Sequence, residues 1–445
     1  MKTKFFAIAA LAATTMFSSC KQDKVTFEEG EATTMKVSIN FPTAPQTRAS
    51  LDPNVQGNEA DLRTVDIFIY YASGSFQSHT RLAATDFSAN PTQGTNSDVY
   101  AYIATTGIPT TTGSKLVFAG INLPTTVRDA LTNSPMSTLT SVAQTMSRSE
   151  LTGTNGFVMF STAATSATFA KDENDPANKV TVRCERLVAK VTVETAVNME
   201  KTGVPGDIQN LMFAVNNFNT KFFMLQGVAP ERRDPNWVMD PTNNFYVGDF
   251  SQAVEADYAN IRRRVSGDND LISNYIPSYA SENTTESKIK GEATRVTVRG
   301  GFIPTQVFTY TGGVLTQIAN PNTTPTTFYF VRPSITEGDF CFNNQAQAEA
   351  FAASRGGATV VTYTGGMCYW DIFLGKNPIN PINKWDVLRN DFYKCNIRRI
   401  NTPGRNLPEL PETEKPKPIE DETNITADIE ILFWHTPVLS DYDLE

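Results

Sequence analysis

Residues 179–197 read KVTVRCERLVAKVTVETAV, and apolar side chains alternate with polar ones on both sides of Arg186 and Leu187. A period of two residues is typical of a β-strand that buries one face, because successive side chains point to opposite faces of a sheet. Val and Thr also fit a pleated, half-buried surface well. This stretch therefore predicts strand structure on both sides of Arg186.

Similar runs recur on both sides of this stretch. Each is short, apolar or alternating, and is closed by Gly, Asn or Pro, as sheet strands commonly are. They cover residues 61–74, 115–124, 210–218, 293–304, 324–333, 358–374 and 385–404. Residues 124–151 show a loosely helical spacing instead. The sequence thus predicts an all-β protein with short helices in its loops.

Chain length and turn residues predict two domains. A chain of 445 residues is too long for one ordinary hydrophobic core. Residues 198–208 are polar and contain Gly203, Pro205 and Gly206, so we place the boundary there. We expect an N-terminal domain over residues 49–200 and a C-terminal domain over residues 201–404.

The stretch 34–50, TMKVSINFPTAPQTRAS, combines a strand with a cut site. Its apolar residues predict one buried face and its polar residues an exposed one. The apolar set is Met35, Val37, Ile39 and Phe41, and the polar set is Lys36, Ser38 and Asn40. Two prolines then lead to a lone Arg48 among small residues, which is typical of an exposed protease site.

The C-terminal end has a second strand behind a linker. Residues 405–424 alternate Pro with Glu and Lys, which predicts an extended, solvated linker that reaches roughly 60 Å at about 3.1 Å per residue. The tail 425–445 then turns apolar again. One face of its predicted strand carries Ile425, Ala427, Ile429, Ile431 and Phe433.

Residues 1–20 have the pattern of a lipoprotein signal peptide. Lys2 and Lys4 precede an apolar stretch that is too short to span a membrane, and FSSC ends at Cys20. Small residues directly before a cysteine predict that Cys20 is acylated and becomes the first residue, although Phe17 replaces the aliphatic residue usual at its position. Residues 21–48 then form a propeptide that contains the removable strand.

Composition and motifs argue against catalysis and nucleic-acid binding. The formal net charge is -9 and the chain has no basic stripe for phosphate. His79 and His435 are the only histidines, and we expect both at the surface. Cys184, Cys341, Cys368 and Cys395 have no zinc-site spacing, and their disulfide state stays open. We expect no enzyme activity, no metal and no cofactor.

Three motifs in this order resemble the fimbrillins, the type V pilins of Bacteroidales, and most of all their shaft subunits. The motifs are FSSC with the later TRAS, CERLVAKVTVE from Cys184, and WDVLRNDFYKCNIRRINTPG over residues 385–404. The resemblance implies two tandem transthyretin-like β-sandwich domains. It also implies an outer-membrane lipoprotein precursor, which becomes part of a cell-surface fimbria that supports adhesion.

The resemblance further implies how such a subunit assembles. An Arg-specific protease cuts between Arg48 and Ala49 and frees the strand Met35–Phe41. The vacated groove accepts the strand Ile425–Phe433 of a neighbouring copy, which gives a linear homopolymer. Anchor and tip subunits and host or bacterial surface receptors are the other implied partners.

Several alternatives remain open from the residues alone. One alternative is a fimbrial tip or anchor subunit, and another is a monomeric surface lipoprotein that binds glycans or host proteins. A hydrolase has the poorest support, because no motif points to one. The two terminal strands are alternatively an ordinary first strand and an ordinary last strand folded back on its own domain.

Overall fold

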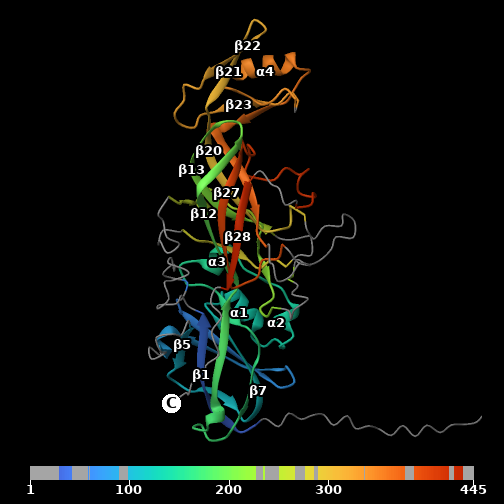
Figure 1. The fold of residues 1–445 in the computed structure, drawn as a ribbon. Coiled ribbons are helices and arrows are strands. Elements are labelled where there is room, and N and C mark those ends of the chain that lie inside the picture. Colours follow the sequence, from blue (N-terminus) through green and yellow to red (C-terminus); the bar gives the residue numbers. More distant parts are fainter. Residues whose placement is uncertain are drawn as a thin grey trace, which may run out of the picture.

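The structure is a computed structural model that describes residues 30–42, 59, 61–89, 99–226, 234–235, 250–265, 276–284, 289–334, 336–375, 385–419 and 425–433. The molecule is elongated (Figure 1). The strands of the N-terminal half lie at one end, those of the C-terminal half lie in the middle, and a small lobe forms the opposite end (Figure 1). None of the described helices is long and apolar enough to cross a membrane.

Strands dominate both halves, which confirms the predicted all-β class. The N-terminal half contains β1 (Ala32–Pro42), β2 (Thr64–Tyr71), β3 (Phe76–Ala83), β4 (Phe87–Ala89), β5 (Val99–Ala104), β6 (Ile108–Thr111), β7 (Gly113–Ile121), β8 (Gln144–Thr145), β9 (Met159–Ser161), β10 (Thr165–Phe169) and β11 (Lys179–Arg186). The middle of the chain contains β12 (Val188–Gly203), β13 (Gly206–Asn216), β14 (Phe218–Asn219), β15 (Lys221–Phe222), β16 (Phe250–Ser251), β17 (Ala259–Asn260), β18 (Arg262–Arg263), β19 (Ser278–Ser281) and β20 (Arg295–Pro304). The remainder contains β21 (Gln306–Thr311), β22 (Val314–Ala319), β23 (Phe328–Val331), β24 (Phe340–Phe342), β25 (Val360–Tyr363), β26 (Met367–Phe373), β27 (Asp391–Thr402) and β28 (Ile425–Phe433).

The N-terminal half builds one long sheet. Its strand order is β3-β2-β7-β9-β11-β1-β5-β4, with β10 paired to β7 and β6 paired to β1. The sheet packs around an apolar core that includes Ile67, Phe118, Phe160 and Val182. β1 is therefore an interior strand of this half, although it comes first among the described strands.

The C-terminal half packs two sheets face to face. One sheet has the order β18-β12-β27-β28, with β19 also on β12, and the other has the order β17-β13-β20-β26. Val191, Phe213, Val298 and Trp370 are among the residues that fill the core between them. The long strand β12 follows β11 after a break at Leu187, so both sides of Arg186 and Leu187 are strands, as the alternation in residues 179–197 predicts.

The two cores meet at the junction of β11 and β12. Val188 belongs to the first core and its neighbour Ala189 to the second. The change of core thus falls upstream of the polar stretch 198–208, which forms the end of β12 and the turn into β13. The domain limits and the transthyretin-like layout stay predictions.

The helices are short. Residues 124–151, where we expected a helix, contain α1 (Thr125–Leu131), α2 (Thr138–Ser141) and the start of α3 (Arg148–Thr152). The sequence interpretation missed α4 (Gln345–Ser354). Its Ala-, Gln- and Glu-rich sequence has high helix propensity, and Asn344 caps it by accepting a hydrogen bond from the Gln347 amide.

A distal lobe extends from the C-terminal half (Figure 1). It consists of the β21–β22 hairpin, the sheet β24-β23-β25 and helix α4. Val331, Phe342 and Phe351 form part of a small core of its own. The hairpin turns at Gly312 and Gly313, both of which have positive φ and open space around them.

Candidate functional site

The candidate site consists of the two terminal strands and the places that hold them. Cys20, Arg48 and Ala49 lie outside the described residues. The predicted removable strand lies in β1 and the predicted donor strand coincides with β28. The structure places these strands in different halves of the molecule and does not bring them together (Figure 1).

β1 has hydrogen-bonding partners on both edges. It runs parallel to β11, where Val37 faces Val180, and antiparallel to β5, where Ile39 faces Tyr102. Its first residues pair with β6 instead, with Met35 opposite Ile108. Removing β1 would therefore expose two rows of backbone donors and acceptors, which is the kind of edge that recruits another strand.

The apolar face of β1 is buried as predicted. Met35, Val37 and Ile39 are 0% exposed, while the side chain of Phe41 lies outside the described part. The expectation of an exposed polar face is wrong except at Lys36, because Ser38 and Asn40 are also buried. An interior strand is enclosed on both edges, and the Ser38 hydroxyl donates to Asn40 Oδ1 at 3.3 Å.

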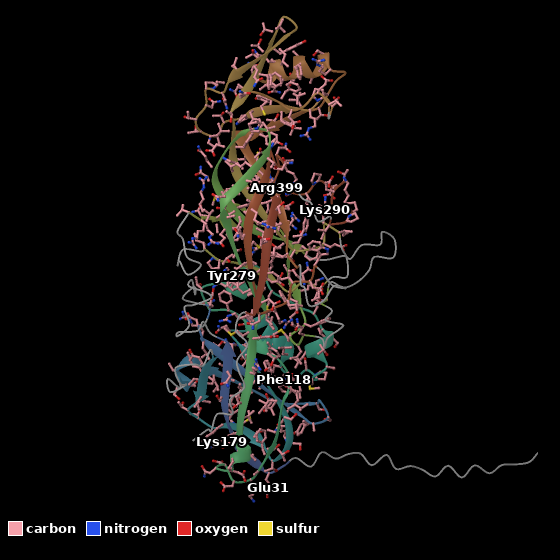
Figure 2. All side chains as sticks on the ribbon, in the orientation of Figure 1. Glu31, Phe118, Lys179, Tyr279, Lys290 and Arg399 are labelled. Atoms are coloured by element: carbon pink, nitrogen blue, oxygen red, sulfur yellow. The ribbon has the colours of Figure 1, made fainter. Side chains whose placement is uncertain are left out.

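Side-chain contacts also hold the beginning of β1. The Thr33 hydroxyl donates to the Ala170 carbonyl at 2.9 Å and accepts from Asn178 Nδ2 at 3.2 Å. At the exposed end, Lys171 Nζ lies 3.0 Å from the Glu31 carboxylate, near the lower pole in Figure 2. These contacts add specificity at the end of the strand that is distant from Arg48 in the sequence.

β28 lies at the edge of its sheet. It runs antiparallel to β27, with Ile425 opposite Ile400 and Ile429 opposite Cys395. Ile425 is buried, but Ala427 and Ile429 are only half-buried, and the side chains of Ile431 and Phe433 lie outside the described part. In the single chain, β28 thus adopts the folded-back arrangement that the sequence left open, and its donation to a neighbour stays a prediction.

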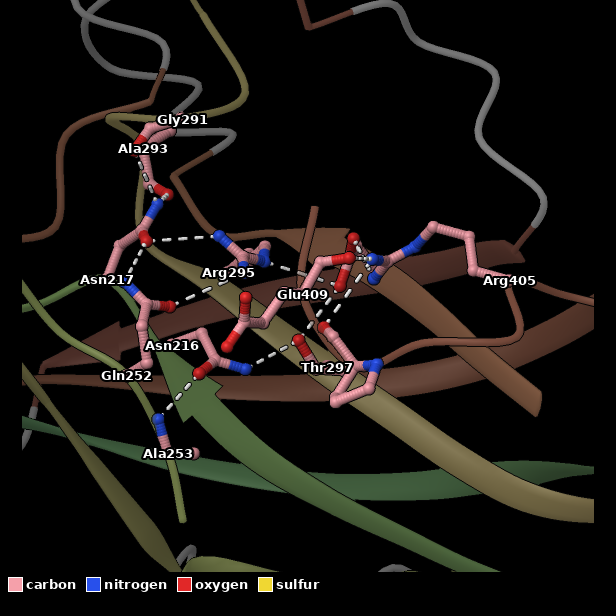
Figure 3. Close-up of polar contacts among 12 residues, drawn as sticks. Asn216, Asn217, Gln252, Ala253, Gly291, Ala293, Arg295, Thr297, Arg405 and Glu409 are labelled. Carbon is pink, nitrogen blue, oxygen red and sulfur yellow. Dashed lines mark hydrogen bonds and ion pairs between the residues drawn. The ribbon is translucent and has the colours of Figure 1, made fainter. Parts of the chain in front are cut away.

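Residues 405–419 are mostly exposed, as predicted for a solvated linker, but contacts with the C-terminal half hold them in place. The Arg405 backbone exchanges two 2.8 Å hydrogen bonds with Tyr369. Its guanidinium donates to Asp371 Oδ2 and to the Glu409 carbonyl, each at 2.5 Å. Asp371 also accepts from Thr297 at 2.8 Å, within the polar network of Figure 3.

A second set of contacts holds the following residues. The amides of Lys290 and Gly291 donate to the carbonyls of Lys417 and Lys415 at 3.0 and 2.9 Å. Lys290 Nζ also lies 3.1 Å from Glu414, and hydrogen bonds from Lys417 and Lys290 lower the pKa of that carboxyl. Proline lacks an amide donor, but carbonyls and charged side chains of a Pro-rich segment still bind an exposed edge.

Histidine and cysteine side chains are the remaining groups considered in the sequence for catalysis or metal binding. His79 lies in β3 and is largely buried, with Nε2 2.8 Å from Asp66 Oδ1, so the expectation of a surface histidine is wrong there. His435 lies outside the described part. Cys184, Cys341, Cys368 and Cys395 are buried free thiols, and burial raises the pKa of Cys395 to about 12. The described residues contain no cluster able to hold a metal ion.

Comparisons with known proteins give one family match. Residues 361–438 match the model described as "Major fimbrial subunit protein type IV, Fimbrillin, C-terminal". The match includes β26, β27 and β28, together with the linker contacts of Arg405. No curated protein matches the chain.

Several solved structures are similar at low identity. A candidate cell adhesion protein from Parabacteroides distasonis has a TM-score of 0.47 at 13% identity, over 91% of this chain and 100% of that one. The tip fimbrial protein Mfa3 from Porphyromonas gingivalis, with a C-terminal truncation, has a TM-score of 0.38 at 14% identity, over 90% and 99%. A fimbrial assembly protein from P. distasonis has a TM-score of 0.37 at 10% identity, over 82% and 92%.

The family match covers the part of the chain that contains β27, whose edge holds β28, and it agrees with the motif at residues 385–404. It confirms the resemblance found in the sequence. Over residues 361–438, which are less than half of the chain, the protein is therefore similar to the C-terminal part of the fimbrillins.

Proposed function

We propose that this protein is the repeating shaft subunit of a cell-surface fimbria, assembled by donor-strand exchange after proteolysis. In this scheme an Arg-specific protease cuts between Arg48 and Ala49 and β1 leaves its groove. The groove then accepts the strand Ile425–Phe433 of a neighbouring copy. Repetition of this step gives a linear homopolymer that ends in anchor and tip subunits and supports adhesion.

One observation carries the proposal: β1 is an interior strand that comes first among the described strands. A cut just downstream of it separates the strand from the body without breaking any later strand connection. Its departure opens two hydrogen-bonding edges and a row of apolar pockets at once. Strand addition gains affinity from the backbone edges and specificity from such pockets.

The energetics favour retention before the cut and exchange after it. Burial of Met35, Val37 and Ile39 contributes about 1.5–3 kcal/mol each. While β1 is tethered, its effective concentration at the groove is on the order of millimolar or more, so an untethered donor cannot compete. The cut removes this advantage. The excised strand then dissociates by dilution, whereas a donor strand remains joined to a folded subunit.

The donor in this scheme is the edge strand β28. Its alternating residues Ile425, Ala427 and Ile429 have the same period of two as Met35, Val37 and Ile39. Leaving β27 costs β28 one ladder of backbone hydrogen bonds, and entry into the groove supplies two. Residues 405–419 contact their own domain. In this scheme, the part of the chain that extends to the neighbouring copy therefore begins at residue 420.

The decisive experiment treats purified residues 21–445 with an Arg-specific protease. We expect ladders on SDS electrophoresis of unboiled samples. An Arg48→Ala chain should stay monomeric under the same treatment, and a chain that lacks residues 425–445 should be cut without forming a ladder. A folded monomer that persists after complete cutting at Arg48 would contradict the proposal.

The proposed export route has a separate test. We propose that Cys20 is acylated and holds the precursor at the outer membrane until the cut releases it. Labelled palmitate should enter the wild-type precursor in cells, and a Cys20→Ser chain should remain unlabelled. Finding Ala49 as the N-terminus of subunits in isolated fimbriae would support the shaft over an anchor, which would keep its lipid.

A further inference from the structure

Glu59 is a buried acid just downstream of the predicted cut. It lies between Arg48 and β2 and is 1% exposed. Acidic side chains are rarely buried this deeply unless they are paired. A buried Glu59 therefore requires partners that balance its charge and donate hydrogen bonds to it.

Three strand residues converge on Glu59. Lys190 Nζ lies 2.9 Å from Oε1 and 3.2 Å from Oε2, and the Tyr279 hydroxyl donates to Oε1 at 2.5 Å. Arg186 Nε donates to the Glu59 backbone carbonyl at 3.1 Å. Lys190 is itself 0% exposed, and its ammonium lies 5.9 Å from the centroid of the Phe392 ring.

These contacts gather at the junction of the two cores. Arg186 ends β11, and Lys190 lies near the start of β12, where it faces Tyr279 of β19 and Phe392 of β27. Tyr279 lies near the middle of the long axis, between Phe118 and Arg399 (Figure 2). A single residue outside both sheets thus contacts three strands where the first core passes into the second.

The same junction continues one wall of the β1 groove. β11 pairs with β1 up to Asn40 opposite Arg183, and Arg186 follows three positions later in the same strand. When β1 leaves, β11 loses its parallel partner. The bond from Arg186 to Glu59 and the ion pair of Lys190 do not involve β1, so they persist through that step.

We propose that Glu59 is a positioning residue of the assembly site. It anchors the chain downstream of the cut to the joint between the two cores, and it fixes the β11–β12 wall of the groove while the groove is empty. This inference rests on the proposed function, because it assigns Glu59 a task in strand exchange. Cleavage then frees β1 while Glu59 keeps its contacts at the joint.

The test compares hydrogen exchange in matched variants of residues 21–445, before and after treatment with the Arg-specific protease. Glu59→Gln keeps the shape of the side chain and removes its charge. The control is Glu282→Gln, since Glu282 is 5% exposed and pairs with Arg389, which is 1% exposed, in another buried ion pair. Both variants remove a carboxylate that pairs with a buried cation, so both should lose stability.

We expect only Glu59→Gln to raise exchange in a peptide covering residues 59–63, by roughly tenfold or more. Exchange at residues 184–190 should also rise in Glu59→Gln, but this peptide does not separate the variants, because Arg389 interacts with Glu185 and the Asn390 amide donates to the Val188 carbonyl. The rise at 184–190 should be larger after the cut, when β1 no longer supports β11. A peptide covering β20 should exchange as in the wild type. Equal exchange in Glu59→Gln and wild type, or an equal local rise in Glu282→Gln, would overturn the proposal.

A double variant covers the case in which Glu59→Gln does not fold. Glu59→Gln with Lys190→Met removes the buried cation together with the carboxylate and should restore the thermal midpoint. Under the proposal the local exchange at residues 59–63 stays fast despite this rescue. Wild-type exchange in the rescued chain would show that Glu59 only balances the charge of Lys190. That result would refute the proposal that Glu59 anchors the chain at the joint.

The outcome is separable from that of the proposed function. The uncut chain already contains the Glu59 contacts. Comparing hydrogen exchange at residues 59–63 between variant and wild type therefore tests the anchoring role of Glu59 before any cleavage. A wild-type chain that is cut and folded but forms no ladder refutes donor-strand exchange. The exchange data on the uncut variants would still decide whether Glu59 holds the joint.

Discussion

β1 and β28 have similar alternating sequences but opposite positions in their sheets. β1 is an interior strand with partners on both edges, and Met35, Val37 and Ile39 are fully buried. β28 is an edge strand with one partner, and Ala427 and Ile429 are half-buried. The strand that we propose to be discarded is thus the better packed of the two. Contacts alone therefore do not decide which strand leaves, and covalent connection has to.

The sharpest test of this comparison makes the same substitution in both strands. Ile39→Ala should lower the free energy of unfolding of the N-terminal half by about 2–5 kcal/mol, because it opens a cavity in a filled core. Ile429→Ala should cost about 1 kcal/mol in the C-terminal half, since its side chain is already partly solvated. Denaturant unfolding followed by circular dichroism, in an Arg48→Ala background, gives both values. Equal losses would refute the contrast between the strands.

The same two substitutions should change polymerisation in opposite directions. After the cut, Ile39→Ala weakens the strand that must leave, and each 1.4 kcal/mol lost speeds its release by about tenfold. Ile429→Ala instead weakens the incoming strand and should slow ladder growth. Gel densitometry against time measures both rates. Unchanged or slower growth with Ile39→Ala would contradict the expectation that release of β1 limits polymerisation.

A smaller effect is expected where the tail is held to its own domain. Arg405→Ala removes the bonds to Asp371 and to the Glu409 carbonyl and should cost about 1–2 kcal/mol locally. Faster hydrogen exchange over residues 405–418 would report this loss. The control is Arg398→Ala, because Arg398 and Asp428 pair across β27 and β28 while more than half exposed, and such pairs contribute little. Equal exchange in the two variants would count against a hold at Arg405.

The smallest effect concerns pH at Glu414. Hydrogen bonds from Lys417 and Lys290 lower the pKa of Glu414 below its ordinary 4.5, so its contribution is present above that value and is lost as the pH falls through the folded pKa. We expect contacts between residues 289–291 and 414–418 to loosen when the pH is lowered from neutral to below about 4.5. Hydrogen exchange at those residues measures this change. Glu414→Gln should remove the pH dependence of exchange at these residues. If the variant keeps the wild-type pH dependence, other titratable groups cause it.

Strand positions could be predicted from the sequence because alternation and turn residues are local signals. Residues 179–197 form β11 and β12, and residues 385–404 contain β27. The burial of Ser38 and Asn40 could not be predicted in this way, because a strand's own sequence does not say whether it lies inside a sheet or at its edge. The parallel pairing of β1 with β11 joins residues far apart in the chain, which periodicity does not report.

The ionic parts of the site were also beyond prediction from pattern. Glu59, Lys190 and Arg405 are charged residues, which are ordinarily exposed, and nothing near them in the sequence identifies their partners. The Pro-rich composition of residues 405–424 indicated an extended chain. It gave no sign that Tyr369 and the edge at residues 289–291 would bind it. Helix α4 could have been predicted from the sequence, because its residues have high helix propensity and Asn344 is a favourable N-cap.

The distal lobe has a consequence for how such a protein can diverge. Val331, Phe342 and Phe351 close a core that is separate from the cores that hold β1 and β28. Substitutions at Val331, Phe342 or Phe351 therefore perturb this small core first. Phe328, Phe330 and Tyr363 of the same sheet belong instead to the core that contains Ile425. In the proposed fibre, selection by a host can reshape this pole of every subunit while the joints between subunits keep their sequence.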